Sequence, residues 1–124
     1  MSHELLHAEL TESIIGSAMK VLNSLRPGLD EKLYENALVI ELRERGHDVA
    51  QQDRYPVRYA GRLIGTLIPD LVVDRLVIVD PKVVSAFSDE HTAQMLGYLN
   101  ISKLRVALLL NFKYRELKWK RIVV

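Results

Sequence analysis

The chain has 124 residues, of which 48% are hydrophobic and 27% are charged, so its composition is that of a globular protein with one core. Its 17 basic and 16 acidic residues leave a net charge of +1, which excludes nucleic-acid binding through overall positive charge. The absence of cysteine excludes disulfides, thiolate nucleophiles and cysteine-ligated zinc.

The first predicted helix covers residues 11–25, where apolar residues recur at helical spacing. Thr11 is the expected N-cap, although the helix could begin earlier, near Glu4. Pro27 and Gly28 form a turn that ends it. The side chains expected to face the core are Ile14, Ile15, Ala18, Met19, Leu22 and Leu25.

A second helix is predicted to begin at Asp30, whose carboxylate can cap the amides that follow it. Gly46 is a natural residue for the position just after a helix, so we expect the helix to end there. The inward side of this helix is expected to carry Leu33, Ala37, Leu38 and Leu42.

Residues 48–84 change to a strand pattern. DVAQQDRYPVRYAG alternates loosely and ends in Ala60-Gly61, a hairpin-type turn. RLIGTLIPDLVV then predicts one long strand, which the tight turn at Asp74-Arg75 joins to LVIVDPKVV. We therefore expect a meander of three or four antiparallel strands.

The C-terminal part returns to helix and then to strands. A helix is predicted over residues 88–102 with Ser88 as N-cap, and its inward residues are expected to be Ala93, Leu96, Leu99 and also Tyr98. RVALLLNF predicts a strand buried on both faces, and WKRIVV a short final strand. The order predicts an α/β (α+β) fold, a mixed sheet flanked by helices, as a single domain over residues 1–124.

Three charged residues interrupt the apolar strands. Asp80 and Lys82 are two apart on a strand and so point to one face. With the turn at Asp74-Arg75, Asp70 pairs roughly with residue 79 or 80, which brings the two carboxylates side by side. Because two such carboxylates repel each other unless a cation lies between them, we expect a divalent metal, Mg²⁺ or Mn²⁺.

Pro81 and Lys82 extend this hypothesis. Pro81 cannot donate a backbone hydrogen bond, but its carbonyl can point at a metal between Asp70 and Asp80. The Lys82 ammonium would then lie beside an attacking water or a substrate phosphate, the arrangement that metal-assisted phosphodiester hydrolysis requires. The alternative is a surface ion pair between Asp80 and Lys82 of small energetic value.

The segment GLDEKLY carries the pattern Gly-x-x-Glu-x-x-Tyr, formed by Gly28, Glu31 and Tyr34. With the flanking IIGSAMKVLNSLRPG and the run from AQMLGYL to LLLNF, the chain resembles the GxxExxY protein family of the PD-(D/E)XK nuclease superfamily over roughly residues 10–124. This resemblance implies a restriction-endonuclease-like core and a metal-dependent nuclease. Its expected substrate is nucleic acid, with DNA preferred to RNA as the expectation.

The resemblance also implies roles for single residues. Glu31 resembles the helical acidic residue that helps to hold a metal, Asp70 the first metal-binding aspartate, and Asp80 and Lys82 the Asp/Glu and lysine positions. Gln94 and Tyr98 resemble the Gln-x-x-x-Tyr helix motif of RecB-like members, which supports the site and contacts nucleic acid; residues four apart share one helical face.

The chain departs from the family at Asp80-Pro81-Lys82, where relatives usually have Glu-Leu-Lys. The shorter aspartate reaches less far toward a metal. The alternative to a nuclease is therefore a catalytically inactive nucleic-acid-binding or protein-interaction module on the same fold. In either case a homodimer or a partner protein could supply specificity.

Other polar residues have weaker patterns. His3 and His7 lack a third metal ligand, and His91 is either an auxiliary base or a surface residue. Near the C-terminus, basic residues alternate with two aromatic ones, either as a nucleic-acid contact surface or as a solvated hairpin end: Lys113, Tyr114, Arg115, Lys118, Trp119, Lys120 and Arg121. No apolar run spans a membrane and no signal peptide is recognisable, so we expect a cytoplasmic protein with no membrane partner.

Overall fold

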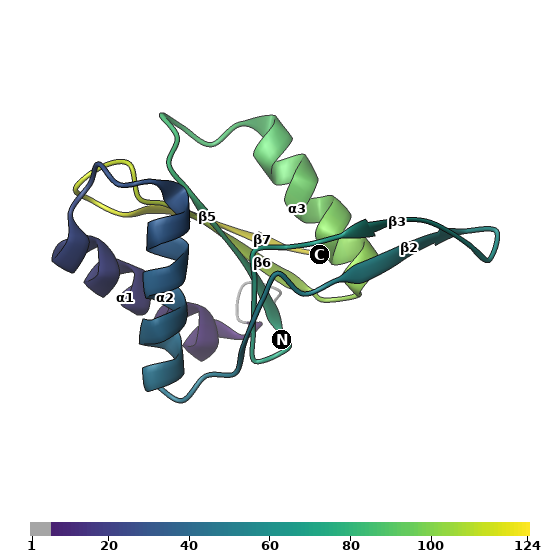
Figure 1. The fold of residues 1–124 in the computed structure, drawn as a ribbon, viewed down its shortest axis with the longest axis horizontal. Helices are drawn as coiled ribbons and strands as arrows, with labels where there is room; N and C mark the ends of the chain where they lie inside the picture. Colours follow the sequence, from purple (N-terminus) through teal and green to yellow (C-terminus); the bar gives the residue numbers. More distant parts are fainter. Residues whose placement is uncertain (1–5) are drawn as a thin grey trace.

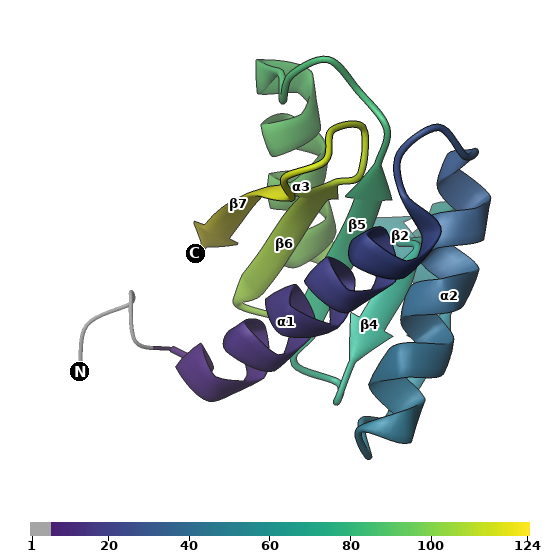
Figure 2. The same ribbon diagram turned by 90° about the vertical axis from the view of Figure 1, so that its left-hand side faces the viewer.

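The computed structural model describes residues 6–124 and consists of three layers. Helices α1 and α2 cover one face of a five-stranded sheet, and α3 covers the other (Figures 1 and 2). A separate two-stranded sheet, formed by β2 and β3, extends from this body. In chain order the elements are α1 (Ala8–Leu25), α2 (Glu31–Glu44), β1 (Val49–Gln51), β2 (Tyr55–Tyr59), β3 (Arg62–Leu67), β4 (Leu71–Val73), β5 (Val77–Lys82), α3 (Asp89–Ser102), β6 (Val106–Asn111) and β7 (Lys118–Val123).

The main sheet is mixed, with the strand order β1-β4-β5-β6-β7. Only β5 and β6 are parallel, because α3 connects them as a crossover helix, whereas the other neighbours are antiparallel. Every residue of β6 is buried, as expected for a central strand covered on both faces. The predicted fold class, a mixed sheet flanked by helices, is confirmed.

The core is divided by the sheet into two clusters. Alternate residues of β5 face opposite sides: Val77 and Val79 pack beneath α1 and α2, whereas Ile78 packs beneath α3 against Met95 and Leu99. The even-numbered residues of β5 therefore face α3. By the same alternation this face receives the side chains that follow Ile78 at positions 80 and 82.

The helix termini differ from the sequence-based expectation in two places. Helix α1 follows His7, which has a left-handed backbone with φ 56°, and Thr11 lies inside the helix, where its hydroxyl donates to the carbonyl of Ala8. The alternative start near Glu4 lies outside the described residues. Asp30 is the N-cap of α2, but its side chain makes no capping hydrogen bond. Gly46 follows the end of α2 with φ 90°, as predicted.

The inward faces of the helices were predicted only in part. Ile14, Ala18, Leu22, Leu38, Leu42 and Leu99 are buried as expected. Ile15, Ala37 and Tyr98 are only half-buried, and the expectation was wrong for Met19, Leu25, Leu33, Ala93 and Leu96, which are exposed. On α3 the buried positions are Met95 and Leu99, because the helix packs on the sheet over a narrow strip. Ser88 caps α3, as predicted, in a reciprocal arrangement with His91.

The predicted long strand over residues 62–73 is divided into β3 and β4, which belong to different sheets. The pairs Gln51↔Leu71 and Tyr55↔Leu67 nevertheless lie in one register, so β1–β2 and β3–β4 are the two sides of one long hairpin that opens in the middle. Pro69 has no N–H to contribute there, and Gln52 adopts φ 60°. The outer half of the hairpin consequently bends away from the main sheet.

Candidate active site

The turn between β4 and β5 sets the positions of the acidic residues. Asp74 and Arg75 both have left-handed backbones, with φ 53° and 59°, and Leu76 N–H donates to the carbonyl of Val73. Positive φ at both central residues is the geometry of a type I′ hairpin turn. Strand pairing begins at Val73↔Val77, so Leu76 is an additional loop residue after this turn, and the resulting register Leu71↔Val79 brings Asp70 level with Asp80 at the far end of the hairpin.

Asp80 lies on the α3 side of the sheet and is only 5% exposed. Its Oδ2 atom lies 3.2 Å from the ammonium nitrogen of Lys82. Burial raises the pKa of the Asp80 carboxyl to about 7, the hydrogen bond with the Asp70 carboxyl raises it in the same direction, and the charge of Lys82 opposes both effects. Three of the predicted residues, Asp70, Asp80 and Lys82, are therefore in one contact network.

Pro81 occupies an interior strand, and its tolerance there has a geometric reason. The carbonyl of Lys82 accepts a hydrogen bond from Phe112 N–H, so this residue's backbone faces β6. Successive residues of a strand direct their backbone groups to opposite sides, and Pro81 therefore faces the side of β4. Because the pairing with β4 ends at Leu71↔Val79, no ladder bond is lost there and the Pro81 carbonyl points toward the Asp70 end of the site.

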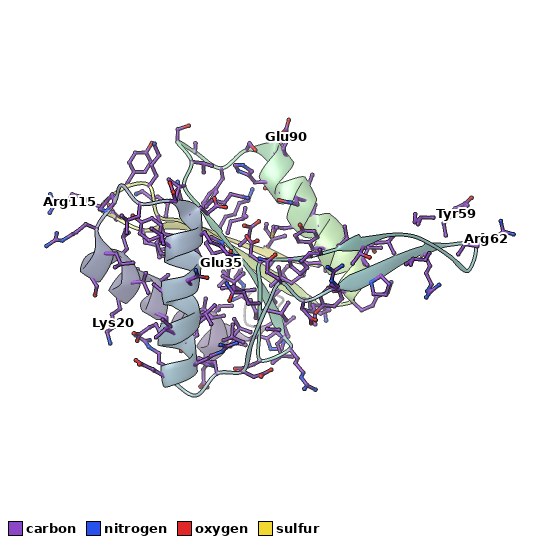
Figure 3. All side chains as sticks on the ribbon, viewed as in Figure 1. Lys20, Glu35, Tyr59, Arg62, Glu90 and Arg115 are labelled. Carbon is purple, nitrogen blue, oxygen red and sulfur yellow. The ribbon has the colours of Figure 1, made fainter. Side chains whose placement is uncertain are left out.

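Glu35 joins this region although the sequence analysis did not select it. Its carboxylate is buried and accepts hydrogen bonds from Lys32 Nζ at 2.8 Å and Gln51 Nε2 at 2.6 Å. Gln52 Nε2 lies 3.4 Å both from Glu35 Oε2 and from Asp70 Oδ1, so that it bridges the two carboxylates. Figure 3 shows Glu35 on α2, beside the strands. A signal was present: Glu35 follows Glu31 by four residues and so shares its helical face.

Glu31 lies at the start of α2 and contacts a different point of the site. Its Oε1 atom accepts a hydrogen bond of 3.2 Å from the N–H of Val83, the residue after Lys82. The contact fixes the end of β5 relative to α2. Its predicted role as a metal ligand stays a prediction.

Tyr34 explains why Gly28, Glu31 and Tyr34 occur together. Its hydroxyl donates to the carbonyl of Arg26 at 2.5 Å and accepts from Leu29 N–H at 3.1 Å, and its ring stacks on Phe112 with centroids 4.9 Å apart. Gly28 adopts φ 114°, which favours glycine. Tyr34 thus fixes the α1–α2 turn to the core. Because Glu31 is in the first turn of α2, the same contacts help to position it beside the end of β5.

Helix α3 contributes Gln94 and Tyr98. The side-chain amide of Gln94 donates to the Tyr98 hydroxyl at 3.1 Å. Burial raises the pKa of the Tyr98 hydroxyl, and the charges of Asp80 and Asp70 act in the same direction. This electrostatic coupling places Tyr98 near the acidic pair, on the same face of the sheet.

The carboxylates of the site are donors for a divalent metal that keeps part of its water shell. Within residues 6–124, no group of three or more His, Cys, Asp or Glu side chains is arranged to hold a metal ion. Magnesium, however, usually keeps several waters and binds through one or two carboxylates together with substrate phosphates. Two carboxylates in contact, one of them with a strongly raised pKa, are the donors that such an ion neutralises. The residues present fit a metal of this kind.

The remaining candidates serve other purposes or stay predictions. His7 precedes α1, and His3 lies outside the described residues. The His91 ring accepts a hydrogen bond from Ser88 N–H and meets Phe87 edge-on, and its role as an auxiliary base stays a prediction. In β7 the basic residues alternate between faces: Lys120 donates to Thr92 of α3, whereas Arg121 donates to Thr11 and to the carbonyl of Leu6.

A second group of hydrogen-bonded polar side chains lies at the other end of β5. Ser13 Oγ is 2.8 Å from His47 Nε2, and His47 Nδ1 is 2.8 Å from Asp74 Oδ2. The order resembles a hydrolase triad, but Ser13 lies inside α1, where amide groups are engaged in helical hydrogen bonds and cannot form an oxyanion hole. We assign the cluster to the joining of α1, the loop after α2 and the β4–β5 turn.

Comparisons with known proteins agree with this geometry. A family model described as the PD-(D/E)XK nuclease superfamily matches residues 8–122, from α1 to β7. No curated protein and no solved structure matches the chain. Across the described part of the chain, every helix is too short or too polar to cross a membrane.

Proposed function

The chain belongs to the PD-(D/E)XK nuclease superfamily, and on that premise we propose that it hydrolyses phosphodiester bonds of nucleic acid with a divalent metal ion. Within the superfamily we assign it to the GxxExxY protein family, which the pattern of Gly28, Glu31 and Tyr34 supports. The observation that carries the proposal is the contact of Asp70, Asp80 and Lys82 on one face of the sheet.

Asp70 and Asp80 are the proposed metal-holding residues, and the Pro81 carbonyl adds an oxygen on the same side. Mg²⁺ or Mn²⁺, when bound there, would lower the pKa of a bound water and act as a Lewis acid toward the phosphate. The acidic pair needs no conformational change to reach a shared cation, because the two carboxyls are already in contact.

Lys82 is the proposed orienting and charge-stabilising group. Its ammonium is held at Asp80 in a largely buried position, so it donates hydrogen bonds without a full hydration shell. A positive group fixed in this way can orient the attacking water and stabilise the negative charge that develops on the phosphate oxygens. Because the Asp80 side chain holds it, its orientation depends on that residue.

The residues around Asp70, Asp80 and Lys82 are proposed to support these three. Glu31, through Val83, and Glu35, through Gln52, are proposed to position the end of β5 and Asp70. Gln94 and Tyr98 on α3 are proposed to support the site and contact the nucleic acid.

The test compares Asp70→Asn with Asp48→Asn, a matched control whose carboxylate is largely exposed in the loop before β1. Mn²⁺ binding is measured by calorimetry, and cleavage of labelled DNA and RNA is measured with Mg²⁺ or Mn²⁺. We expect Asp70→Asn to lose metal binding and cleavage while keeping its circular dichroism spectrum, and Asp48→Asn to keep all three. Wild-type protein that binds nucleic acid but cleaves none of the substrates would indicate the inactive binding module instead.

A further inference from the structure

The outer half of the long hairpin, residues 54–67, forms an arm. Strands β2 and β3 pair only with each other, and they extend past α3 away from the body of the molecule (Figure 1). Ala60 and Gly61 form a two-residue turn with φ 50° and 76° at the tip. Two-stranded ribbons are marginally stable in water on their own, so a surface that this arm contacts would add to its stability.

The arm exposes side chains that proteins usually bury. Tyr59 is 74% exposed, Ile64 is 66% exposed and Leu63 is 58% exposed. Tyr59 and Arg62 pair across the strands beside the turn and lie at the far end of the molecule (Figure 3). The tip therefore combines an aromatic ring, a guanidinium and aliphatic side chains in open solvent.

The charge of the arm is of one sign. It contains Arg54, Arg58 and Arg62 and no Asp or Glu, in a chain whose net charge is +1. Among the salt bridges of residues 6–124, none involves these three arginines. Such an arrangement is complementary to a polyanion.

The arm begins at the acidic site. Gln52 N–H donates to the carbonyl of Asp70 at 3.0 Å, at the point where the hairpin opens. Tyr55, at the base of the arm, packs with Tyr98 against the core cluster beneath α3, the face on which Asp80 lies. A ligand at Asp70 and Asp80 that continues past Tyr55 would therefore meet the arm.

We propose that the arm enters the major groove of B-form duplex DNA and holds it against the site. The inference rests on the proposed function, since it takes nucleic acid to be the substrate. The major groove admits a two-stranded ribbon, whereas that of A-form RNA is too narrow. A single strand would need a row of aromatic rings for its bases, and Tyr59 is the one strongly exposed aromatic residue of the arm.

The experiment measures binding of a labelled duplex by fluorescence anisotropy in EDTA, where no metal-dependent cleavage occurs. Arg62→Gln is compared with Lys20→Gln, which removes the same charge from an exposed position on α1, away from the arm (Figure 3). We expect Arg62→Gln to weaken duplex binding several-fold and to reduce the slope of log K against log salt by about one unit. Tyr59→Ala should also weaken it, and Lys20→Gln should have little effect.

Three results would overturn the assignment: no binding of the duplex by wild-type protein, equal losses in Arg62→Gln and Lys20→Gln, or binding of single strands or duplex RNA as tight as that of duplex DNA. Sedimentation velocity tests the alternative that the arm binds a second copy of this chain. A wild-type dimer that Leu63→Thr dissociates would make the arm an interface between two copies and would also overturn it.

Cleavage by the same variants in Mn²⁺ separates the two proposals. Arm-dependent duplex binding without cleavage by the wild-type protein would leave the arm assignment standing and remove the nuclease. Cleavage and duplex binding that are both unchanged in Arg62→Gln and Tyr59→Ala would remove the arm assignment and leave the nuclease standing.

Discussion

The ammonium nitrogen of Lys82 lies 3.2 Å from the Oδ2 atom of Asp80, and both side chains are largely buried. Removing one member of a buried pair leaves the other charge uncompensated, which is costly unless that group becomes neutral. Asp80 can become neutral near physiological pH, because its pKa is about 7. A variant in which Lys82 is replaced by an uncharged residue is therefore expected to fold, because Asp80 can take up a proton.

The first prediction follows from this pair. Lys82→Met should reduce cleavage by at least about a hundredfold, because the fixed positive group is lost from the reacting phosphate. It should raise the pKa of Asp80 further, so the loss of stability should be larger at pH 8 than at pH 6. Single-turnover cleavage and thermal melting at both pH values check these expectations. Unchanged cleavage in Lys82→Met would exclude the proposed role of this residue.

The second prediction concerns pH and stability without metal. The ordinary pKa of an aspartate is 3.8, whereas that of Asp80 in the folded protein is about 7, so between these pH values the folded protein holds a proton on Asp80 that the unfolded chain has lost. The free energy of unfolding should therefore fall as the pH rises through this window, because the folded state binds more protons there. Urea denaturation in EDTA measures it. Asp80→Asn, which cannot ionise, should lose this part of the pH dependence.

The third prediction concerns the bridge from Gln52 to Asp70. Gln52→Asn keeps the amide and tolerates the left-handed backbone, but it is one methylene shorter and should no longer reach both carboxylates. Loss of such a supporting contact typically weakens metal affinity by about 10- to 100-fold. Gln51→Asn is the comparison, because it shortens the neighbouring amide, which donates to the same Glu35 carboxylate and to Asn36 but not to Asp70. Mn²⁺ titrations with equal affinities in both variants would contradict the positioning role.

The fourth prediction concerns the Tyr34 hydroxyl. Tyr34→Phe keeps the stacking on Phe112 but removes hydrogen bonds to Arg26 and Leu29. We expect the free energy of unfolding to fall by about 1 kcal/mol, the typical net contribution of a hydrogen bond, because the backbone groups of Arg26 and Leu29 lose their partner at a partly buried position. Urea denaturation measures the loss, and Tyr59→Phe on the exposed arm should be neutral by comparison. A neutral Tyr34→Phe would show that water replaces these hydrogen bonds.

Much of the candidate site was predictable because its spacing is local. Counting from a turn centred on Asp74-Arg75 places residue 70 opposite residue 79 or 80, so the sequence brings the two aspartates close together along the hairpin. The observed register, Leu71↔Val79, puts Asp70 opposite Asp80 because Leu76 adds a third residue to the loop. Asp80 and Lys82 share a face because they are two residues apart on one strand. The strand over residues 106–111 was equally clear, since a continuous apolar run between turns is typical of a buried central strand.

The contacts that were missed depend on packing between distant segments. Gln52 bridges Glu35 and Asp70, but the three residues are far apart in the sequence and their spacing follows no pattern. The contact forms because α2 packs beside the strand ends that carry Gln52 and Asp70. The inward side of α3 was misassigned because Leu96 and Met95 are equally apolar, and the tilt of the helix on the sheet decides which is buried.

The sequence by itself determined the order of the elements, the closeness of Asp70 and Asp80 along one hairpin, and the shared face of Asp80 and Lys82, because these depend on backbone periodicity and one tight turn. The register that puts Asp70 opposite residue 80 and not residue 79 was decided only by the structure, which adds Leu76 to the loop. Only the tertiary structure decided that the long hairpin opens at Pro69 and sends an arm of three arginines away from the main sheet. The division of the hairpin between two sheets depends on the relative free energies of alternative strand pairings and helix contacts. These involve residues far apart in the sequence, so no local pattern predicts them.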